Sequence, residues 1–406
     1  MKTTLLLLVL AFGSAHAAPR SLSQTPSPES TPIVTPEDAG PVAPPPLADG
    51  SQALAPLIVT PEQAAAVAKG LAWLAANQGE DGSWTSKIGY KLNEDYKYTA
   101  ANRGHVGVTA LAGMAFLAGG HLPGRGEYGT NVERCLDFVL GCVDDDGYIS
   151  QSGTRMYSHA FATLFLAEIY GMTHREDVRG KLQKAIDFIV KSQNAEGGWR
   201  YEPYAVESDM SIVVCQVLAL RAARNIGIRV PKSTVDRAAR YVVDSAVTAQ
   251  NASRSAYPGR YSRGSEIGSF HYQVGVHARS SFPLTAAGVT ALHGLGIYSD
   301  EAIQRGIDYL NRSLDEFNAQ YGNAPQITRR GHYFFWYGHY YGVQAMYTIG
   351  SPYWEPYFEE VRDVLLEIQN KNGSFPNSVG PGDAFGTAMG VLILEIPYRF
   401  LPIFQR

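Results

Sequence analysis

The sequence predicts an all-α fold, an (α/α)6 toroid in which six helical hairpins close a single barrel. One observation is a pattern of a basic residue, a small residue, two variable positions and an aromatic residue. It recurs at intervals of about 50 to 70 residues, which is typical of repeated supersecondary units. The other is that a second, more apolar helix is predicted after each copy. The copies begin at Lys69, Arg134, Lys184, Arg237 and Arg305, with a degenerate sixth at Glu360.

The first 58 residues are predicted to lie outside this fold. Residues 1–17, "MKTTLLLLVLAFGSAHA", have the apolar run and the small-x-small end of a signal peptide, so an extracytoplasmic protein is expected. Residues 18–58 are rich in Pro and form a predicted disordered arm, either a tether or a segment for a protein partner. Residues 59–406 form the toroid domain. Its first helix is expected to start with Thr60 as N-cap, Pro61 as first helical residue and Gln63 completing a capping box.

The two helices of each hairpin differ in polarity. The first keeps charged residues at amphipathic spacing, as expected for an outer ring. The second carries Ala, Gly, Leu and Thr around much of its circumference, as expected for a helix packed on several sides. These inner helices are predicted within residues 106–120, 156–171, 208–227, 282–296, 332–350 and 383–396.

Composition limits the function classes. The chain has 406 residues, 45% of them hydrophobic, and a net charge of −4, so there is no electrostatic case for nucleic-acid binding. After the leader no stretch is apolar enough to span a membrane. The three cysteines, Cys135, Cys142 and Cys215, are interpreted as buried small hydrophobic residues.

Two stretches resemble a known repeat. "KGLAWLAANQGEDGSW" (69–84) and "KAIDFIVKSQNAEGGW" (184–199) are similar to the QW repeat of terpenoid cyclases and protein prenyltransferase β subunits, with "EIQNKNGSF" (367–375) as a weaker third. The resemblance covers about residues 60–406 and implies a six-hairpin toroid with an apolar central cavity. Gln78, Gln193, Trp84 and Trp199 are then expected to close the ring, not to contact a ligand.

The catalytic motifs of those families are incomplete here. Where class II cyclases carry D-x-D-D, the chain reads "VESDMSIVV" (206–214), with Asp209 at the last position and Ser208 at the middle one. The magnesium-binding D-D-x-x-D motif is absent, and Asp209 with Cys215 does not make the zinc-binding D-x-C pair. No metal and no cofactor is therefore expected. The length allows one barrel, where a triterpene cyclase has two.

The candidate site residues lie mainly on the second and fifth inner helices. Asp209, His159 and Tyr157 are the candidate catalytic residues, at the helix N-termini that form one mouth of the ring. Tyr333 and its aromatic neighbours would form a cavity wall suited to isoprenoid chains or sugar rings. The candidate ligand-binding residues are Arg155, Glu168, Glu207, His332, Tyr333, Trp336 and His339.

Three functions remain open from the sequence. The first is an extracytoplasmic toroid that binds an isoprenoid or other apolar small molecule, with or without modifying it. The second is a carbohydrate-active α/α-barrel lyase or hydrolase, with Tyr157 and His159 as base and Arg155 as charge neutraliser. The third is a non-catalytic scaffold tethered by its arm. A closed apolar cavity would favour the first, a wide polar groove the second and a filled ring the third.

Overall fold

The structure is a computed structural model that describes residues 59–404, except 93–94, 253–265, 276–278 and 322–330. The chain divides into two units, Met1–Ala53 and Leu54–Arg406, and the described residues belong to the second. The predicted signal peptide and arm lie outside the described residues. In the described part of the chain, every helix is too short or too polar to cross a bilayer.

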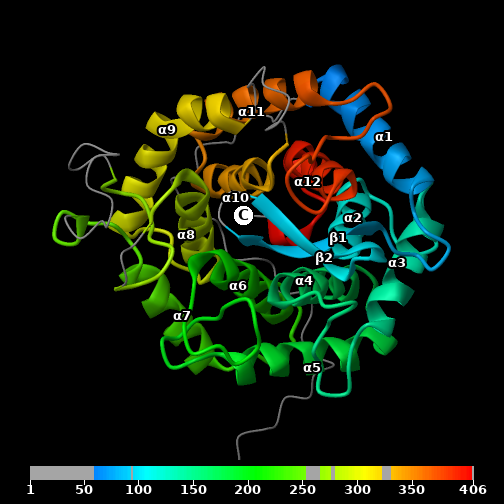
Figure 1. The fold of residues 1–406 in the computed structure, drawn as a ribbon, viewed down its shortest axis with the longest axis horizontal. Coiled ribbons are helices and arrows are strands. Elements are labelled where there is room, and N and C mark those ends of the chain that lie inside the picture. The colour runs from blue at the N-terminus through cyan, green and yellow to red at the C-terminus, as the bar shows by residue number, and fades with distance from the viewer. Residues whose placement is uncertain (1–58, 93–94, 253–265, 276–278, 322–330, 405–406) are drawn as a thin grey trace, which may run out of the picture. The chain divides into compact units, whose positions relative to one another are not determined.

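The second unit consists of two concentric rings of helices (Figure 1). The outer helices are α1 (Pro61–Ala76), α3 (Gly129–Gly141), α5 (Glu176–Ser192), α7 (Lys232–Asp244), α9 (Glu301–Tyr321) and α11 (Trp354–Ile368). The inner helices are α2 (Val106–Ala118), α4 (Met156–Thr173), α6 (Met210–Asn225), α8 (Phe282–Gly294), α10 (Tyr333–Ile349) and α12 (Asp383–Glu395). Five of the inner helices fall within their predicted ranges and α4 extends two residues beyond its own, so the predicted (α/α)6 toroid is confirmed.

The inner ring is closed. Each inner helix contacts the next one along the chain, and α12 returns to contact α2. Every residue of α2 is buried, whereas α7 buries only Thr234, Ala238, Tyr241 and Val242. This difference in burial is the one expected from the polarity of the two sets of helices.

The start of α1 follows the sequence rules in part. Thr60 is the N-cap, and its hydroxyl accepts a hydrogen bond from the Gln63 N–H at 3.1 Å. The second half of the expected capping box is wrong, because the Gln63 side chain donates to the Leu394 carbonyl at 2.6 Å. This bond pairs the amide nitrogen of a buried side chain and connects the first helix of the ring to the last.

The turns that end the outer helices connect neighbouring hairpins. The Gln193 amide donates to the carbonyls of Gly197, at 2.7 Å, and Thr234, at 3.0 Å, so it links α5 to α7. The Trp199 indole donates to the Ile189 carbonyl in the last turn of α5 at 2.8 Å. The same bonds recur with Gln78 (Gly82, Asn131), Trp84 (Leu74) and Gln369 (Gly373, Ala66).

The basic residue of each repeat marks a close contact between hairpins. Gly197 has φ 93°, and a Cβ there would collide with the Arg237 carbonyl of the next outer helix, so only glycine fits. The corresponding pairs are Gly82 with Arg134, Gly147 with Lys184, Gly268 with Arg305 and Gly373 with Lys69. The last of these pairs joins the sixth hairpin to the first and closes the ring.

A small β-hairpin, not predicted from the sequence, lies between α1 and α2. Strands β1 (Thr85–Leu92) and β2 (Asp95–Gly104) pair antiparallel and lie across the middle of the ring in Figure 1. The Lys87 N–H donates to the Pro381 carbonyl at 2.8 Å, which attaches the hairpin to the loop before α12. The hairpin therefore covers the N-terminal ends of the inner helices.

The opposite end of the ring meets the C-terminal segment. Two short 3-10 helices, η3 (Ile396–Tyr398) and η4 (Pro402–Phe404), follow α12, and η4 contacts α4 and α6. The Ile403 N–H donates to a carboxylate oxygen of Glu168, in the C-terminal half of α4, at 3.3 Å. The hairpin and the C-terminal segment therefore lie at opposite ends of the inner helices.

Candidate functional site

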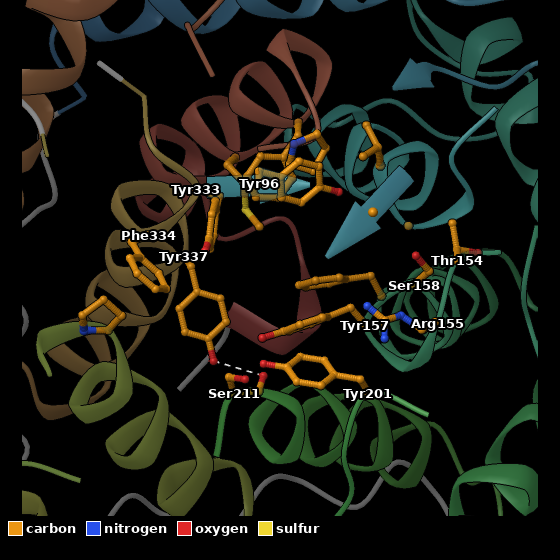
Figure 2. A pocket seen from close by; sticks show the side chains of 18 of the residues that line it. Tyr96, Thr154, Arg155, Tyr157, Ser158, Tyr201, Ser211, Tyr333, Phe334 and Tyr337 are labelled. Atoms are coloured by element: carbon orange, nitrogen blue, oxygen red, sulfur yellow. Dashed lines mark hydrogen bonds between the residues drawn. The ribbon is translucent and has the colours of Figure 1, made fainter. Parts of the chain in front are cut away.

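A cavity of about 560 Å³ lies at the N-terminal ends of the inner helices, beneath the β-hairpin (Figure 2). All six inner helices contribute to its wall, together with both strands of the hairpin. Most of the exposed wall is apolar, and the deepest contributions come from Leu111 of α2, Phe161 of α4 and Met389 of α12. Its size and its apolar character are those of a small-molecule site.

Tyrosine is the main polar residue type of the wall. Six tyrosines are among the described residues that line the cavity, namely Tyr96, Tyr157, Tyr201, Tyr272, Tyr333 and Tyr337. In Figure 2 the hydroxyl groups of Tyr157, Tyr201 and Tyr337 point toward the same space near Ser211. Burial raises the pKa of Tyr96 to about 12 and those of Tyr157 and Tyr337 well above the usual 10. These side chains are therefore neutral near pH 7, with an apolar ring and one hydroxyl each.

Asp209 lies directly behind this wall as the N-cap of α6. It is fully buried, and one oxygen accepts hydrogen bonds from the Ser211 hydroxyl at 2.5 Å and the Ile212 N–H at 3.1 Å. The other oxygen accepts from the Tyr272 hydroxyl at 3.3 Å. Ser211 and Tyr272 both line the cavity, so two hydroxyl groups connect the carboxyl group with it.

The environment of Asp209 changes its acidity. Burial raises the pKa from 3.8 to about 6, and the hydrogen bonds from Ser211, Ile212 and Tyr272, together with the Arg200 charge, oppose the rise. The Arg200 Nε lies 3.9 Å from the second oxygen. Near neutral pH the group can therefore either donate or accept a proton, which is the property that a general acid or base needs.

Among the described residues of the wall, two arginines carry the charge. The Arg155 guanidinium pairs with Glu202 at 2.9 Å and lies 5.5 Å from the centre of the Tyr201 ring. The Arg279 guanidinium lies 4.7 Å from the centre of the Tyr272 ring. No Asp or Glu is among the described residues that line the cavity. Its charged groups are therefore positive, and the N-terminal ends of the inner helices add partial positive charge.

Three of the residues named from the sequence line the cavity, namely Tyr157, Arg155 and Tyr333. Of the other candidates at the helix N-termini, Asp209 is one layer behind the wall, as described. Glu207 is exposed and forms an ion pair with Arg200. His332 is the N-cap of α10, and its Nδ1 accepts from the Phe334 N–H at 3.1 Å.

His159, His339 and Trp336 lie on the outward side of the inner helices. The His159 Nδ1 accepts from the Ile149 N–H at 3.1 Å, and its ring packs against Phe188 of α5. His339 bonds to Tyr357 and Asn318 of the outer ring, and the Trp336 indole donates to the Pro376 carbonyl. A helix turns about 100° per residue, so His159 and His339 point roughly 160° away from the lining residues two positions earlier, Tyr157 and Tyr337.

Glu168 lies at the other end of α4. It is buried, and burial raises its pKa to about 8, while the hydrogen bond from the Ile403 N–H opposes the rise. Its contact is with the C-terminal segment and not with the cavity wall.

Several residues of the wall were not predicted from the sequence. Tyr96 and Ile88 come from the hairpin, whose strands were not predicted. Tyr272 and Arg279 come from the segment before α8, which carries no repeat motif. The alternation in "IGYKLNEDYKYTA" (88–100) around a polar turn is the one sequence signal that could have indicated the hairpin.

The described residues contain no group of three or more His, Cys, Asp or Glu that could hold a metal ion. The cavity wall offers tyrosine and serine hydroxyls and two guanidinium groups to a ligand. These groups can bind a ligand, and the hydroxyls of Ser211 and Tyr272 can exchange protons with Asp209 through their hydrogen bonds.

Solved structures with the same fold come from several enzyme classes. The GH76A α-1,6-mannanase from Salegentibacter sp. HEL1_6 is 8% identical, with a TM-score of 0.58, covering 83% of this chain and 99% of that one. The type II terpene cyclase MstE from Scytonema is 14% identical, with a TM-score of 0.52, covering 84% and 99%. A protein from Actinoplanes is 12% identical, with a TM-score of 0.54, covering 83% and 98%. At these identities the likeness shows the fold alone.

A match to a family model shows which family the chain belongs to. No curated protein matches the chain. The model of the prenyltransferase alpha-alpha toroid domain matches residues 45–265, more than half of the 406 residues. That match agrees with the six-hairpin ring and with the turns that join its outer helices. The chain belongs to the prenyltransferase alpha-alpha toroid family.

Proposed function

We propose that the protein binds an isoprenoid or other amphipathic ligand, with the apolar part inside the cavity and a hydroxylated or anionic end at the mouth. The main observation behind this proposal is the composition of the cavity wall. The wall is largely apolar, and the charged groups among its described residues are all positive. Removing apolar surface from water contributes about 25 cal/mol per Å². The hairpin over the mouth adds to this burial.

A polar group at the mouth supports the proposed orientation. The Tyr333 hydroxyl is buried and has no hydrogen-bond partner among the described residues. Leaving such a group unpaired costs about 1 to 3 kcal/mol, so a ligand hydroxyl or carbonyl that reaches it is favoured. A type II terpene cyclase with this fold has been solved with geranylgeranyl dihydroxybenzoate, a substrate that joins an isoprenoid chain to a polar ring. We propose the same combination, an apolar isoprenoid chain with a polar group at one end, for the ligand of this protein.

Any conversion of the ligand would begin at Asp209. The carboxyl group does not line the cavity, so in this proposal the Ser211 or Tyr272 hydroxyl gives its own proton to a double bond or leaving group of the ligand. The same hydroxyl oxygen takes the Asp209 proton in exchange, and Asp209 is left as a carboxylate that accepts a proton back when the product forms. Asp209 would then be a general acid, and Tyr157 would face the reacting end of the ligand. His159 has no part in this scheme, because its ring lies outside the cavity.

The carbohydrate-active alternative has less support. Glycoside hydrolysis generally uses two carboxyl groups that flank the scissile bond. The described lining residues include neither Asp nor Glu, and the apolar, partly covered cavity differs from a wide polar groove. The scaffold alternative predicted a filled ring, and the cavity of about 560 Å³ speaks against it. We also propose export through the N-terminal signal sequence, which would present the site to extracytoplasmic ligands.

Mass spectrometry of a solvent extract of the purified full-length protein tests the proposal. We expect one recurring isoprenoid or related lipid, because the apolar wall should retain its guest through purification. Leu284→Trp, which fills the cavity from α8, should lose the guest. Val206→Trp is the matched control, since Val206 is 82% exposed, and it should keep the guest. An empty wild-type protein that binds oligosaccharides would contradict the proposal.

A further inference from the structure

The cavity ends at an aromatic layer inside the ring. Phe161 is the deepest lining residue of α4, and its ring centre lies 6.2 Å from that of Tyr340, which is edge-on to it. Tyr340 lies one turn below Tyr337, the deepest lining residue of α10, and is itself 1% exposed. The space below the cavity is therefore occupied by the Tyr340 ring.

The C-terminal segment supports this layer from below. The Phe404 ring centre lies 6.4 Å from that of Tyr340, again in an edge contact, and Phe404 is 4% exposed. Phe161, Tyr340 and Phe404 thus form a continuous aromatic column from the bottom of the cavity to the last described turn of the chain. Phe404 is the member of this column that does not belong to an inner helix.

One hydrogen bond holds the turn at a defined depth. The Ile403 N–H donates to Glu168, seven residues after Phe161 on α4, which places the turn about 10 Å below the bottom of the cavity. Because Glu168 is buried, this bond is shielded from water. The C-terminal turn is thereby fixed against α4, one of the helices that line the cavity.

We infer that this C-terminal turn is the floor of the ligand cavity and sets the longest apolar chain that the protein can bind. The inference rests on the proposed function and adds a specificity determinant to it. Contact with Phe404 fixes the orientation of the Tyr340 side chain. In that orientation Tyr340 closes the bottom of the cavity along the central axis of the toroid. Without the Phe404 ring, Tyr340 can turn downward, and the cavity gains length along the axis.

Binding of straight-chain primary alcohols, lengthened one methylene group at a time, tests the inference with the full-length protein. Each methylene group that enters the cavity should raise the affinity about fourfold. In the wild-type protein this gain should stop at one chain length, where the chain reaches the floor. In Phe404→Ala the gain should continue to longer alcohols, while the shorter alcohols bind with wild-type affinity.

Two further variants keep the test decisive. Phe400→Ala is the matched control, since Phe400 lies in the same segment but is 51% exposed, and the limit should stay in place. Phe404→Met keeps apolar volume but replaces the rigid ring with a flexible chain, so it should fold even where the alanine variant does not, and the limit should again move. A limit that stays unchanged in the folded Phe404 variants would overturn the inference and leave the proposed function intact. A wild-type protein that binds none of the alcohols would overturn both.

Discussion

Asp209 shows how one residue can serve both the fold and the site. Asp209 is the N-cap of α6, and its carboxyl group accepts a hydrogen bond from the Ile212 N–H. The first N–H groups of every helix need such a partner. The Ser211 and Tyr272 hydroxyls that bond to the same carboxyl group face the cavity. A structural requirement therefore places an ionisable group next to the ligand space, and burial then adjusts its pKa toward neutrality.

Asp209→Asn should separate the two roles. Asparagine is an equally good N-cap, so the variant should fold and bind the ligand, while any conversion of the ligand should be lost.

The raised pKa of Asp209 means that the folded state binds more protons than the unfolded state between pH 3.8 and about 6. The stability from this group is thus present below pH 3.8 and is lost as the pH rises through 6. The difference amounts to roughly 3 kcal/mol.

Urea unfolding at pH values from 4 to 7 measures this effect. The wild-type protein should lose free energy of unfolding across this range relative to Asp209→Asn. Asp236→Asn is the matched control, because Asp236 is in an exposed pair with Lys232. Equal pH dependence in wild-type and Asp209→Asn would show that the pKa of Asp209 is not raised by folding.

At the scale of elements, the turns between hairpins determine how the rings assemble. Gln193 connects α5 and α7 through the hydrogen bonds of its amide. Gly197 has no side chain, so the backbone of α7 can approach the turn closely. Trp199 satisfies a carbonyl at the end of α5 and is 2% exposed. The turn after α5 therefore combines a hydrogen bond, a close backbone contact and a buried ring, and none of these three residues is among those that line the cavity.

Trp199→Ala should destabilise the protein without a direct effect on ligand contacts. Removing a buried tryptophan is expected to cost about 3 to 5 kcal/mol. Thermal unfolding measures the loss, and Tyr204→Ala is the matched control, since Tyr204 follows in the same loop but is 60% exposed. An unchanged melting temperature with ligand binding abolished would show that Trp199 belongs to the site.

At the scale of the whole molecule, closure of the ring makes the six hairpins depend on one another. α1 packs on α12, and Gln63 and Gln369 bond across this seam. An open array of repeats has two ends at which unfolding can begin, and a closed ring has none. The cavity depends on this closure too, because its wall includes residues from all six inner helices.

A larger side chain in the contact between α1 and α12 should therefore lower the free energy of unfolding of the entire ring. Gly70→Val places methyl groups against Val391 of α12, and such overpacking costs about 1 to 3 kcal/mol. Calorimetry should show one transition at a lower temperature. Gly180→Val is the matched control, since nothing lies within 4 Å of a Cβ at Gly180. Two separate transitions, with the side of the ring near α6 unaffected, would indicate independent hairpins.

The amino-acid sequence by itself determined the order and the kind of the helices. The apolar ranges 106–120 and 383–396 became α2 and α12, and Thr60 with Pro61 began α1 as expected. These features depend on local periodicity and on capping, which a single stretch of chain carries within itself.

Only the tertiary structure decided which side chains share the cavity. Tyr157 and His159 are two positions apart, and the rotation of α4 that the neighbouring helices impose turns one inward and the other outward. Arg279 and Tyr96 reach the wall from segments without a repeat pattern. Phe404 packs against Tyr340, which in turn packs against Phe161, because the ring brings the C-terminal turn beneath the cavity. Contacts between residues so far apart in sequence arise from packing, and no local pattern encodes them.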